Sequence, residues 1–207
     1  MVEQLIKIFV VFFVVIEPIS LVPLFGALTR GGGKKYRRVM AVKSVLLSAG
    51  IFLLFALSGE LLLRTLGITI EAFRIAGGLL LFMIALDMVF ARQSGLRSTT
   101  VKEQDEARYR EDISVFPLAF PLMAGPGSLA TLFLVMGDIG GDPAMFLGML
   151  GVIGLILLST LGLLLLTRPI MRVLGETGAN VISRLFGVIL VALAVQYVVD
   201  GIQAIFM

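Results

Sequence analysis

Glu17 is the residue of this sequence whose type and setting point most directly to chemistry. It begins the run 17–23 (EPISLVP), which lies inside a long apolar segment. An ionisable group in the middle of such a segment is costly and is commonly functional in membrane proteins. Two roles are open for it. It could bind a coupling cation, a proton or a substrate ammonium, or it could cap a helix that begins at Pro18.

The segment 124–128 (AGPGS) is the second place where the sequence favours a binding site. Proline removes a backbone donor and clashes with the preceding turn, and glycine adds backbone freedom, so both segments predict a helix broken near its middle. Freed N–H groups at such a break bind a carboxylate, and freed carbonyl oxygens bind an amine or Na⁺. The two breaks therefore predict a site for a small zwitterion. The alternative is that both are kinks that only shape helix packing.

Hydroxyl and small residues beside the breaks complete the predicted site. Serine in a membrane helix also bonds its own backbone, so a structural role for these hydroxyls stays open. The predicted substrate site comprises Glu17, Pro18, Ser20, Gly125, Pro126, Gly127, Ser128 and Thr131. Glu17 is in addition the candidate ligand of the coupling ion. We expect Arg74 and Arg184, near the starts of later spans, to reach the membrane interface rather than the substrate.

The two segments belong to an internal repeat. Residues 18–25 line up with residues 126–133 at one constant offset, and the same offset pairs residues 66–69 with residues 174–177. Similarity recurs in all three spans of each half, and because three is an odd number, the second copy must cross the membrane in the opposite orientation. Inverted repeats of this kind are a recurring architecture of secondary transporters. A duplication retained only for packing is the alternative.

Composition identifies the elements that must position these residues. Of the 207 residues, 58% are hydrophobic and 15% are charged, whereas soluble domains are nearer half apolar and a quarter charged. The excess lies in apolar runs of about 20 residues, the length that a bilayer core requires of a helix. The fold class predicted is therefore an all-α membrane protein with the first and fourth of six spans broken at mid-membrane. The spans are expected at about 4–28, 40–63, 70–91, 113–136, 144–167 and 180–205.

Charge in the loops predicts the topology. Lysine and arginine gather after the first, third and fifth spans, which places those loops in the cytoplasm and both termini outside the cell membrane. The expected organisation is a first three-helix repeat over 1–91, a charged cytoplasmic linker over 92–112, and a second, inverted repeat over 113–207.

Residues that are missing exclude several functions. The chain has no cysteine and no histidine, so it offers no disulfide, no thiolate metal site and none of the commonest general base. Without clustered carboxylates we expect no enzyme, and without a nucleotide fingerprint no ATP-driven pump. The net charge of +3 is better explained by topology than by nucleic-acid binding. No cofactor is expected apart from Na⁺ as a candidate coupling ion.

The segments 17–25 with Leu28-Thr29, and 124–128, resemble the two signature segments of the MarC family of membrane proteins. The resemblance, with its six spans, covers essentially the whole chain. Its archaeal SnatA branch transports small neutral amino acids such as glycine and alanine, so the resemblance implies amino-acid transport through a pocket formed by both segments. One departure matters: the family usually has Asp or Asn before the first proline, where this sequence has Glu17.

The leading hypothesis is therefore a secondary transporter of small neutral amino acids, driven by Na⁺ or H⁺. The expected partners are such a solute and the lipid bilayer, and association with further copies of the chain stays open. Two other hypotheses remain: an exporter or channel for another small metabolite, and a membrane scaffold that transports nothing. The scaffold predicts that Glu17→Ala and Gly127→Leu leave the biological activity intact.

Overall fold

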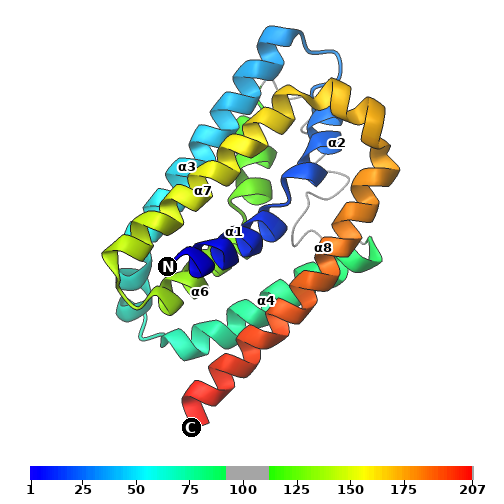
Figure 1. Cartoon of the computed structure of the whole chain (residues 1–207). Helices are drawn as coiled ribbons and strands as arrows, with labels where there is room; N and C mark the ends of the chain where they lie inside the picture. Colours follow the sequence, from blue (N-terminus) through cyan, green and yellow to red (C-terminus); the bar gives the residue numbers. More distant parts are fainter. Residues whose placement is uncertain (92–111, 207) are drawn as a thin grey trace.

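The computed structural model describes residues 1–91 and 112–206, and in these ranges the chain folds into helices without strands (Figure 1). In chain order these are α1 (Val2–Ile16), α2 (Pro18–Leu28), α3 (Lys34–Thr65), α4 (Ile70–Phe90), the irregular helical segment η1 (Ser114–Met123), α6 (Pro126–Ile139), α7 (Pro143–Leu165) and α8 (Thr167–Phe206).

The predicted all-α membrane class is confirmed. Five stretches are long and apolar enough to cross a bilayer: Val2–Leu28, Lys34–Gly59, Ile70–Phe90, Pro143–Leu165 and Thr177–Phe206. The segment η1 followed by α6 passes the same test as a pair bent by 48°, which makes it a broken sixth span or a re-entrant loop. Both broken crossings are the ones that the proline-rich segments predicted, since α1 and α2 divide at Glu17.

The broken crossings lie inside the bundle and the unbroken helices around them (Figure 1). Of the most apolar window of Val2–Leu28, 61% is buried inside the protein, whereas the windows of the four unbroken spans are 28–39% buried. The large apolar side chains exposed on α3, α4, α7 and α8 are therefore the surface that faces lipid. A central crossing enclosed by its neighbours can carry polar groups that lipid would not tolerate.

Helices that correspond between the two halves meet corresponding partners. In the first half, α2 packs against α7 and α8; in the second, α6 packs against α3 and α4. The counterparts α3 and α7 contact each other, as do α4 and α8. Local conformation follows the same rule, because Gly67 and Gly175 both have positive φ angles, 68° and 63°. Reciprocal contacts between the two halves are what the predicted duplication requires. The inverted orientation of the second half stays a prediction.

Close approach of α4 and α8 depends on glycine. A Cβ added at Gly78 would lie 2.9 Å from the carbonyl oxygen of Ala194, and one added at Gly187 would lie 2.8 Å from the Cβ of Met88. Contacts this close between two helices exclude any larger residue at these positions.

Two boundaries differ from the expected ones. The second span was expected from about residue 40, but α3 begins at Lys34, because lysine and arginine favour a helix that continues beyond the apolar core. The chain after α7 was expected to be a turn, but residues 167–174 are helical up to Gly175, whose left-handed φ interrupts α8. Of the expected linker, residues 92–111 lie outside the described residues, and the domain boundaries stay a prediction.

Candidate functional site

The first break is a single residue in an unusual conformation. Glu17 has φ 50° and ψ 62°, the left-handed region that residues with a side chain adopt infrequently. Its N–H donates to the carbonyl of Phe13 (2.9 Å) and ends α1, while its own carbonyl accepts from the N–H of Ser20 (3.1 Å). Pro18 then begins α2, where its missing N–H costs nothing. One carboxylate-bearing residue is thereby fixed between two helices, with only 1% of its surface exposed.

Both roles considered for Glu17 stay predictions, including that of a negative group at the start of α2. Glu17 does occupy the N-cap position of α2, but no N–H of the first turn donates to its carboxylate. A glutamate side chain is longer than the serine or aspartate that suits this geometry. The hydroxyl oxygen of Ser20 is buried nearby and has no hydrogen bond to any described residue. The first turn of α2 therefore uses the backbone carbonyl of Glu17, and neither the Glu17 carboxylate nor the Ser20 hydroxyl makes a capping hydrogen bond to it.

The second break is built from closely packed backbone. Phe116 and Phe120 have extended backbone angles within η1, and Gly125 ends the break where α6 begins at Pro126. A Cβ at Gly125 would lie 1.8 Å from the carbonyl oxygen of Pro121, so only glycine fits. The carbonyl of Gly125 accepts from the N–H of Leu129 (2.9 Å) in the first turn of α6.

Both hydroxyls predicted beside this break are engaged with the main chain. Ser128 donates to the carbonyl oxygens of Met123 (2.8 Å) and Gly125 (3.1 Å), and Thr131 donates to that of Gly127 (2.9 Å). Both residues are buried. In this conformation both hydroxyls bond to nearby backbone carbonyls, which is the structural alternative for such hydroxyls.

The two breaks approach each other without forming an open pocket. A Cβ at Gly127 would lie 2.6 Å from Ile84 of α4 and 3.8 Å from Val15 of α1, just before Glu17. The cavity here is about 10 Å³ and is lined by Val15, Ile84, Pro121, Leu122, Gly125, Pro126, Gly127 and Ser128. It holds about one water molecule. The lining of this cavity includes Val15 from the end of α1 and not Glu17, and a substrate site shared by the two breaks stays a prediction.

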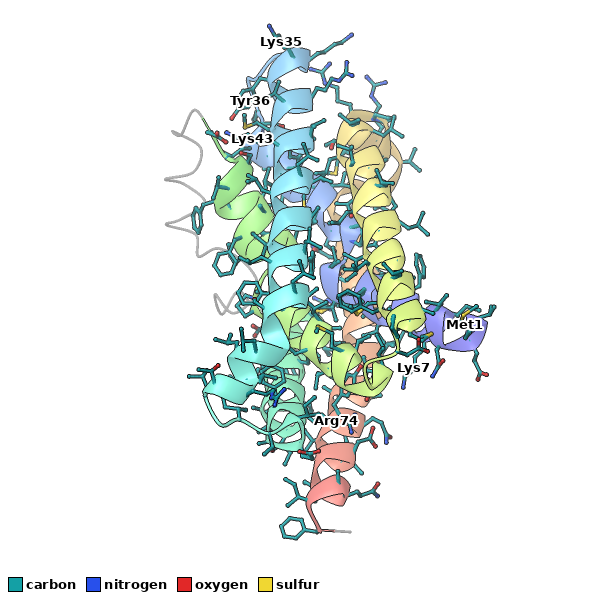
Figure 2. The ribbon with its side chains drawn as sticks, turned by 90° about the vertical axis from the view of Figure 1, so that its left-hand side faces the viewer. Met1, Lys7, Lys35, Tyr36, Lys43 and Arg74 are labelled. Atoms are coloured by element: carbon teal, nitrogen blue, oxygen red, sulfur yellow. The ribbon has the colours of Figure 1, made fainter. Side chains whose placement is uncertain are left out.

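Larger cavities lie toward both ends of the bundle. One of about 320 Å³ is lined by Gln4, Lys7, Ile8, Val11, Arg74, Val135, Gly137, Asp138, Ile139, Met145, Tyr197 and Asp200. Another, of about 420 Å³, is lined by residues of α2, α3 and α8 and the turn after α2. Figure 2 shows the two ends, with Arg74 at one and Lys35 of α3 at the other.

Arg74 does not simply reach out to the membrane interface. Its guanidinium donates to Asp138 at the end of α6 (2.5 Å), and its side chain is only 20% exposed. This ion pair links α4 of the first half to α6 of the second, and both of its residues line the 320 Å³ cavity. Sequence reasoning missed this partner because residues 74 and 138 are far apart along the chain. Arg184, its counterpart in the repeat, is exposed as expected.

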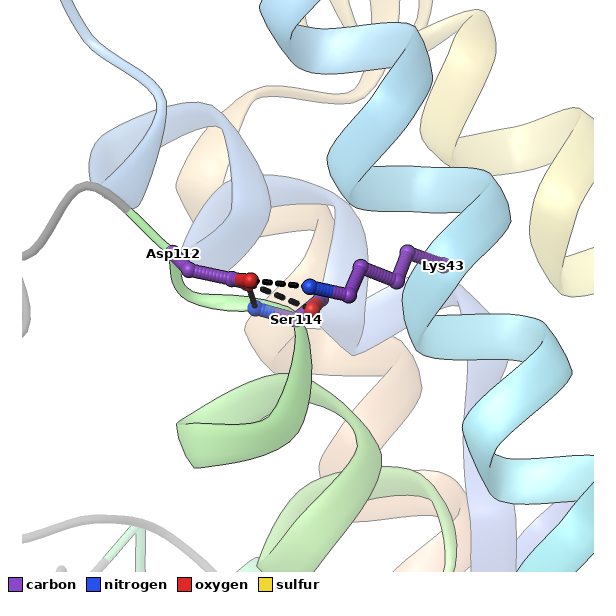
Figure 3. Close-up of polar contacts among 3 residues, drawn as sticks. All are labelled: Lys43, Asp112 and Ser114. Atoms are coloured by element: carbon purple, nitrogen blue, oxygen red, sulfur yellow. Dashed lines mark hydrogen bonds and ion pairs between the residues drawn. The ribbon is translucent and has the colours of Figure 1, made fainter.

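Asp112 holds the start of η1 to α3 (Figure 3). Its carboxylate accepts hydrogen bonds from Lys43, from the Ser114 N–H (2.9 Å) and from the Ser114 hydroxyl (2.5 Å). These bonds, with Lys43 first and then Ser114, lower the pKa of Asp112 to about 2. The spacing Asp112-x-Ser114 is a local turn signal that could have predicted the Ser114 contact, but not Lys43.

The lowered pKa predicts how Asp112 contributes to stability. A carboxyl whose pKa is lower in the folded state stabilises the fold above its unfolded value of about 3.9, and this stabilisation is lost as the pH falls toward 2. Asp112→Asn should therefore melt below the wild type at pH 6, with a clearly smaller difference at pH 2.5, which lies between the folded and unfolded pKa values. Thermal unfolding of detergent-solubilised protein at both values measures it. An unchanged difference at the two pH values would show that the charge of Asp112 is not the cause.

Among the described residues, no three His, Cys, Asp or Glu side chains gather where they could hold a metal ion. A weakly bound Na⁺ needs fewer side chains, since backbone carbonyls and one carboxylate supply suitable oxygens. Glu17 carries both kinds of oxygen, a backbone carbonyl and a carboxylate.

Comparison with known proteins identifies the family. The model of the MarC family of integral membrane proteins matches residues 2–206. The chain belongs to the MarC family. It is 38% identical over 195 residues to the UPF0056 membrane protein MJ1677 of Methanocaldococcus jannaschii, covering 92% of each chain. It is 34% identical over 200 residues to the UPF0056 membrane protein YhcE of Escherichia coli, covering 97% and 92%. The resemblance seen in the sequence is confirmed at this level, and no solved structure matches the chain.

Proposed function

We propose that this MarC-family protein is a secondary transporter of small neutral amino acids, coupled to Na⁺ or H⁺. The observation that carries the proposal is the pair of broken crossings packed together inside the bundle, one of them interrupted at the buried carboxylate residue Glu17. Interrupted helices at membrane depth are tolerated only inside protein or beside a watery cavity, and in transporters they form the substrate and ion sites.

Alternating access fits the distribution of space in the molecule. The cavity at the breaks is about 10 Å³, too small for any amino acid, while cavities of about 320 and 420 Å³ lie toward opposite ends. An occluded centre between two wider vestibules is the arrangement expected of a transporter between its outward-open and inward-open states. The corresponding contacts of the two halves support such an exchange, because each half can take the packing of the other.

The substrate class rests on site chemistry and on the family resemblance together. A helix start at Pro126 offers N–H groups to a carboxylate, and Glu17 offers a partner to an ammonium. The steric limits at Gly125 and Gly127 favour a solute with a very small side chain. Glycine and alanine, which the resemblance to SnatA-type transporters implies, meet this description.

We propose the cell membrane as the location, with both termini outside. The relative YhgN of Escherichia coli, 34% identical over 203 residues, is described as an inner membrane protein. Lys35, in the first turn of α3, lies at one end of the bundle, as a cytoplasmic end requires, and Arg74 lies toward the other (Figure 2).

Uptake into liposomes tests the proposal. The purified full chain, reconstituted in proteoliposomes, should accumulate labelled glycine or alanine when an inward Na⁺ or H⁺ gradient is imposed, with saturation and with no uptake in protein-free vesicles. Accumulation that stops when the gradient is dissipated identifies the coupling ion. Flux that never saturates would indicate a channel instead, and no flux of any small amino acid under either gradient would overturn the proposal.

A further inference from the structure

The cavity of about 420 Å³ at the Lys35 end of the bundle has a chemistry that the proposed transport does not use. It lies where the end of α2 meets the first turn of α3 and the start of α8. Its lining consists of Pro23, Gly26, Ala27, Arg30, Arg37, Thr167, Arg168, Met171 and Arg172. Four of these residues are arginines and none is acidic.

The four guanidinium groups come from three parts of the chain. Arg168 and Arg172 are one helical turn apart at the start of α8 and share a face, Arg37 lies in the first turn of α3, and Arg30 lies in the turn after α2. A cytoplasmic location requires only that basic residues lie at this end of the bundle. It does not require them to line one cavity. Their mutual repulsion raises the energy of the folded state, so an anion in the cavity would be stabilising.

Arg37 is held in place beside the cavity. Its guanidinium donates to the carbonyl oxygen of Thr29 (3.3 Å), and its buried Nε has no hydrogen bond to any described residue. A guanidinium that is fixed at one nitrogen and has no hydrogen bond at another is positioned to bind an oxyanion, because its planar N–H donors match two oxygens of a phosphate.

The remaining lining is apolar and rigid. Pro23, Ala27 and Met171 contribute apolar surface, and α2 and α8 approach so closely that a Cβ at Gly26 would lie 3.1 Å from the methyl of Thr167. A site with arginines and an adjoining apolar surface suits a phosphate ester with an apolar part, as at the membrane interface.

We propose that this arginine cavity, defined by Arg30, Arg37, Arg168 and Arg172, binds a phosphate group, carried by an anionic phospholipid headgroup or by free phosphate. Binding would hold the end of α2, the start of α3 and the start of α8 together. The inference rests on the cavity and its charges, and it stands or falls independently of amino-acid transport.

Thermal unfolding of the full chain in a neutral detergent tests the site. One arm adds short-chain phosphatidylglycerol, with short-chain phosphatidylcholine as the zwitterionic comparison. The other adds sodium phosphate, with sodium chloride at matched sodium concentration and ionic strength. A saturable rise in Tm with phosphatidylglycerol alone identifies a lipid headgroup, and a rise with phosphate alone or with both identifies a site open to free phosphate. No rise in either arm overturns the proposal.

Matched variants show whether the rise in Tm comes from binding in the arginine cavity. The double variant Arg168→Gln with Arg172→Gln should raise the apparent Kd for the stabilising ligand at least about tenfold, since each substitution removes a charge-assisted contact. The control variant, Lys35→Gln with Arg38→Gln, removes the same charge from exposed positions at the same end of the bundle but outside the cavity lining. It should change the apparent Kd less than about threefold. If the first pair fails to fold, Arg30→Gln against Arg38→Gln makes the same comparison. Equal weakening by target and control variants would overturn the proposal.

Discussion

Gly125→Ala, at the residue before α6, should destabilise the protein more than a methyl group added at any of the described helical glycines. The added Cβ would lie 1.8 Å from the carbonyl oxygen of Pro121 and 2.8 Å from its carbonyl carbon. These atoms are backbone, so no side-chain rotation can relieve the overlap. Overpacking of this kind costs typically about 1–3 kcal/mol, and the rigid neighbour places this case at about 3. For a chain of this size that corresponds to a Tm lower by roughly 10 °C.

The matched control is Gly154→Ala in α7. No atom lies within 4 Å of a Cβ added at Gly154, and alanine favours a helix interior over glycine by about 0.5–1 kcal/mol. We therefore expect this variant to melt at or slightly above the wild-type temperature. Thermal unfolding of both purified variants in the same detergent gives the comparison. If Gly125→Ala melted together with Gly154→Ala, the packing of the second break described here would be wrong.

The sequence was sufficient for features that depend on local chemistry. Apolar length predicted the crossings, and the prolines at residues 18 and 126 predicted where the helices restart, because each lacks an N–H that a helix interior needs and a first turn does not. The repeat predicted that Leu66-Gly67 and Leu174-Gly175 would behave alike, and both glycines adopt a left-handed φ. Such features require only residues that are neighbours in the chain.

Features that depend on distant parts of the chain could not be predicted in this way. Neither the pairing of Arg74 with Asp138 nor that of Lys43 with Asp112 follows from spacing, since each joins separate helices. For Ser128 and Thr131 the sequence left both a substrate role and bonding to the nearby backbone open, and it could not decide between them. The closed cavity at the breaks likewise depends on how Val15 and the side chains of α4 pack against Gly127.

Glu17→Gln should abolish gradient-driven uptake while leaving the fold intact. Glutamine keeps the size and shape of the side chain at the first break but cannot carry a proton or a negative charge. Glu17 is the only ionisable residue in the segments 17–25 and 124–128, so no neighbour in either break can replace its charge. We expect accumulation of labelled glycine or alanine to fall at least about tenfold, the size of effect that loss of one proton-transfer or ion-binding group produces.

Two comparisons show what a loss of uptake in Glu17→Gln means. Glu3→Gln removes a carboxylate from an exposed position on the neighbouring helix α1 and should transport as the wild type does. Exchange of internal for external substrate without a gradient should survive in Glu17→Gln if the carboxylate carries a proton, and should be lost if it binds the substrate ammonium. Wild-type accumulation in Glu17→Gln would remove the carboxylate from the mechanism. The left-handed residue between α1 and α2 would then be explained by helix geometry alone.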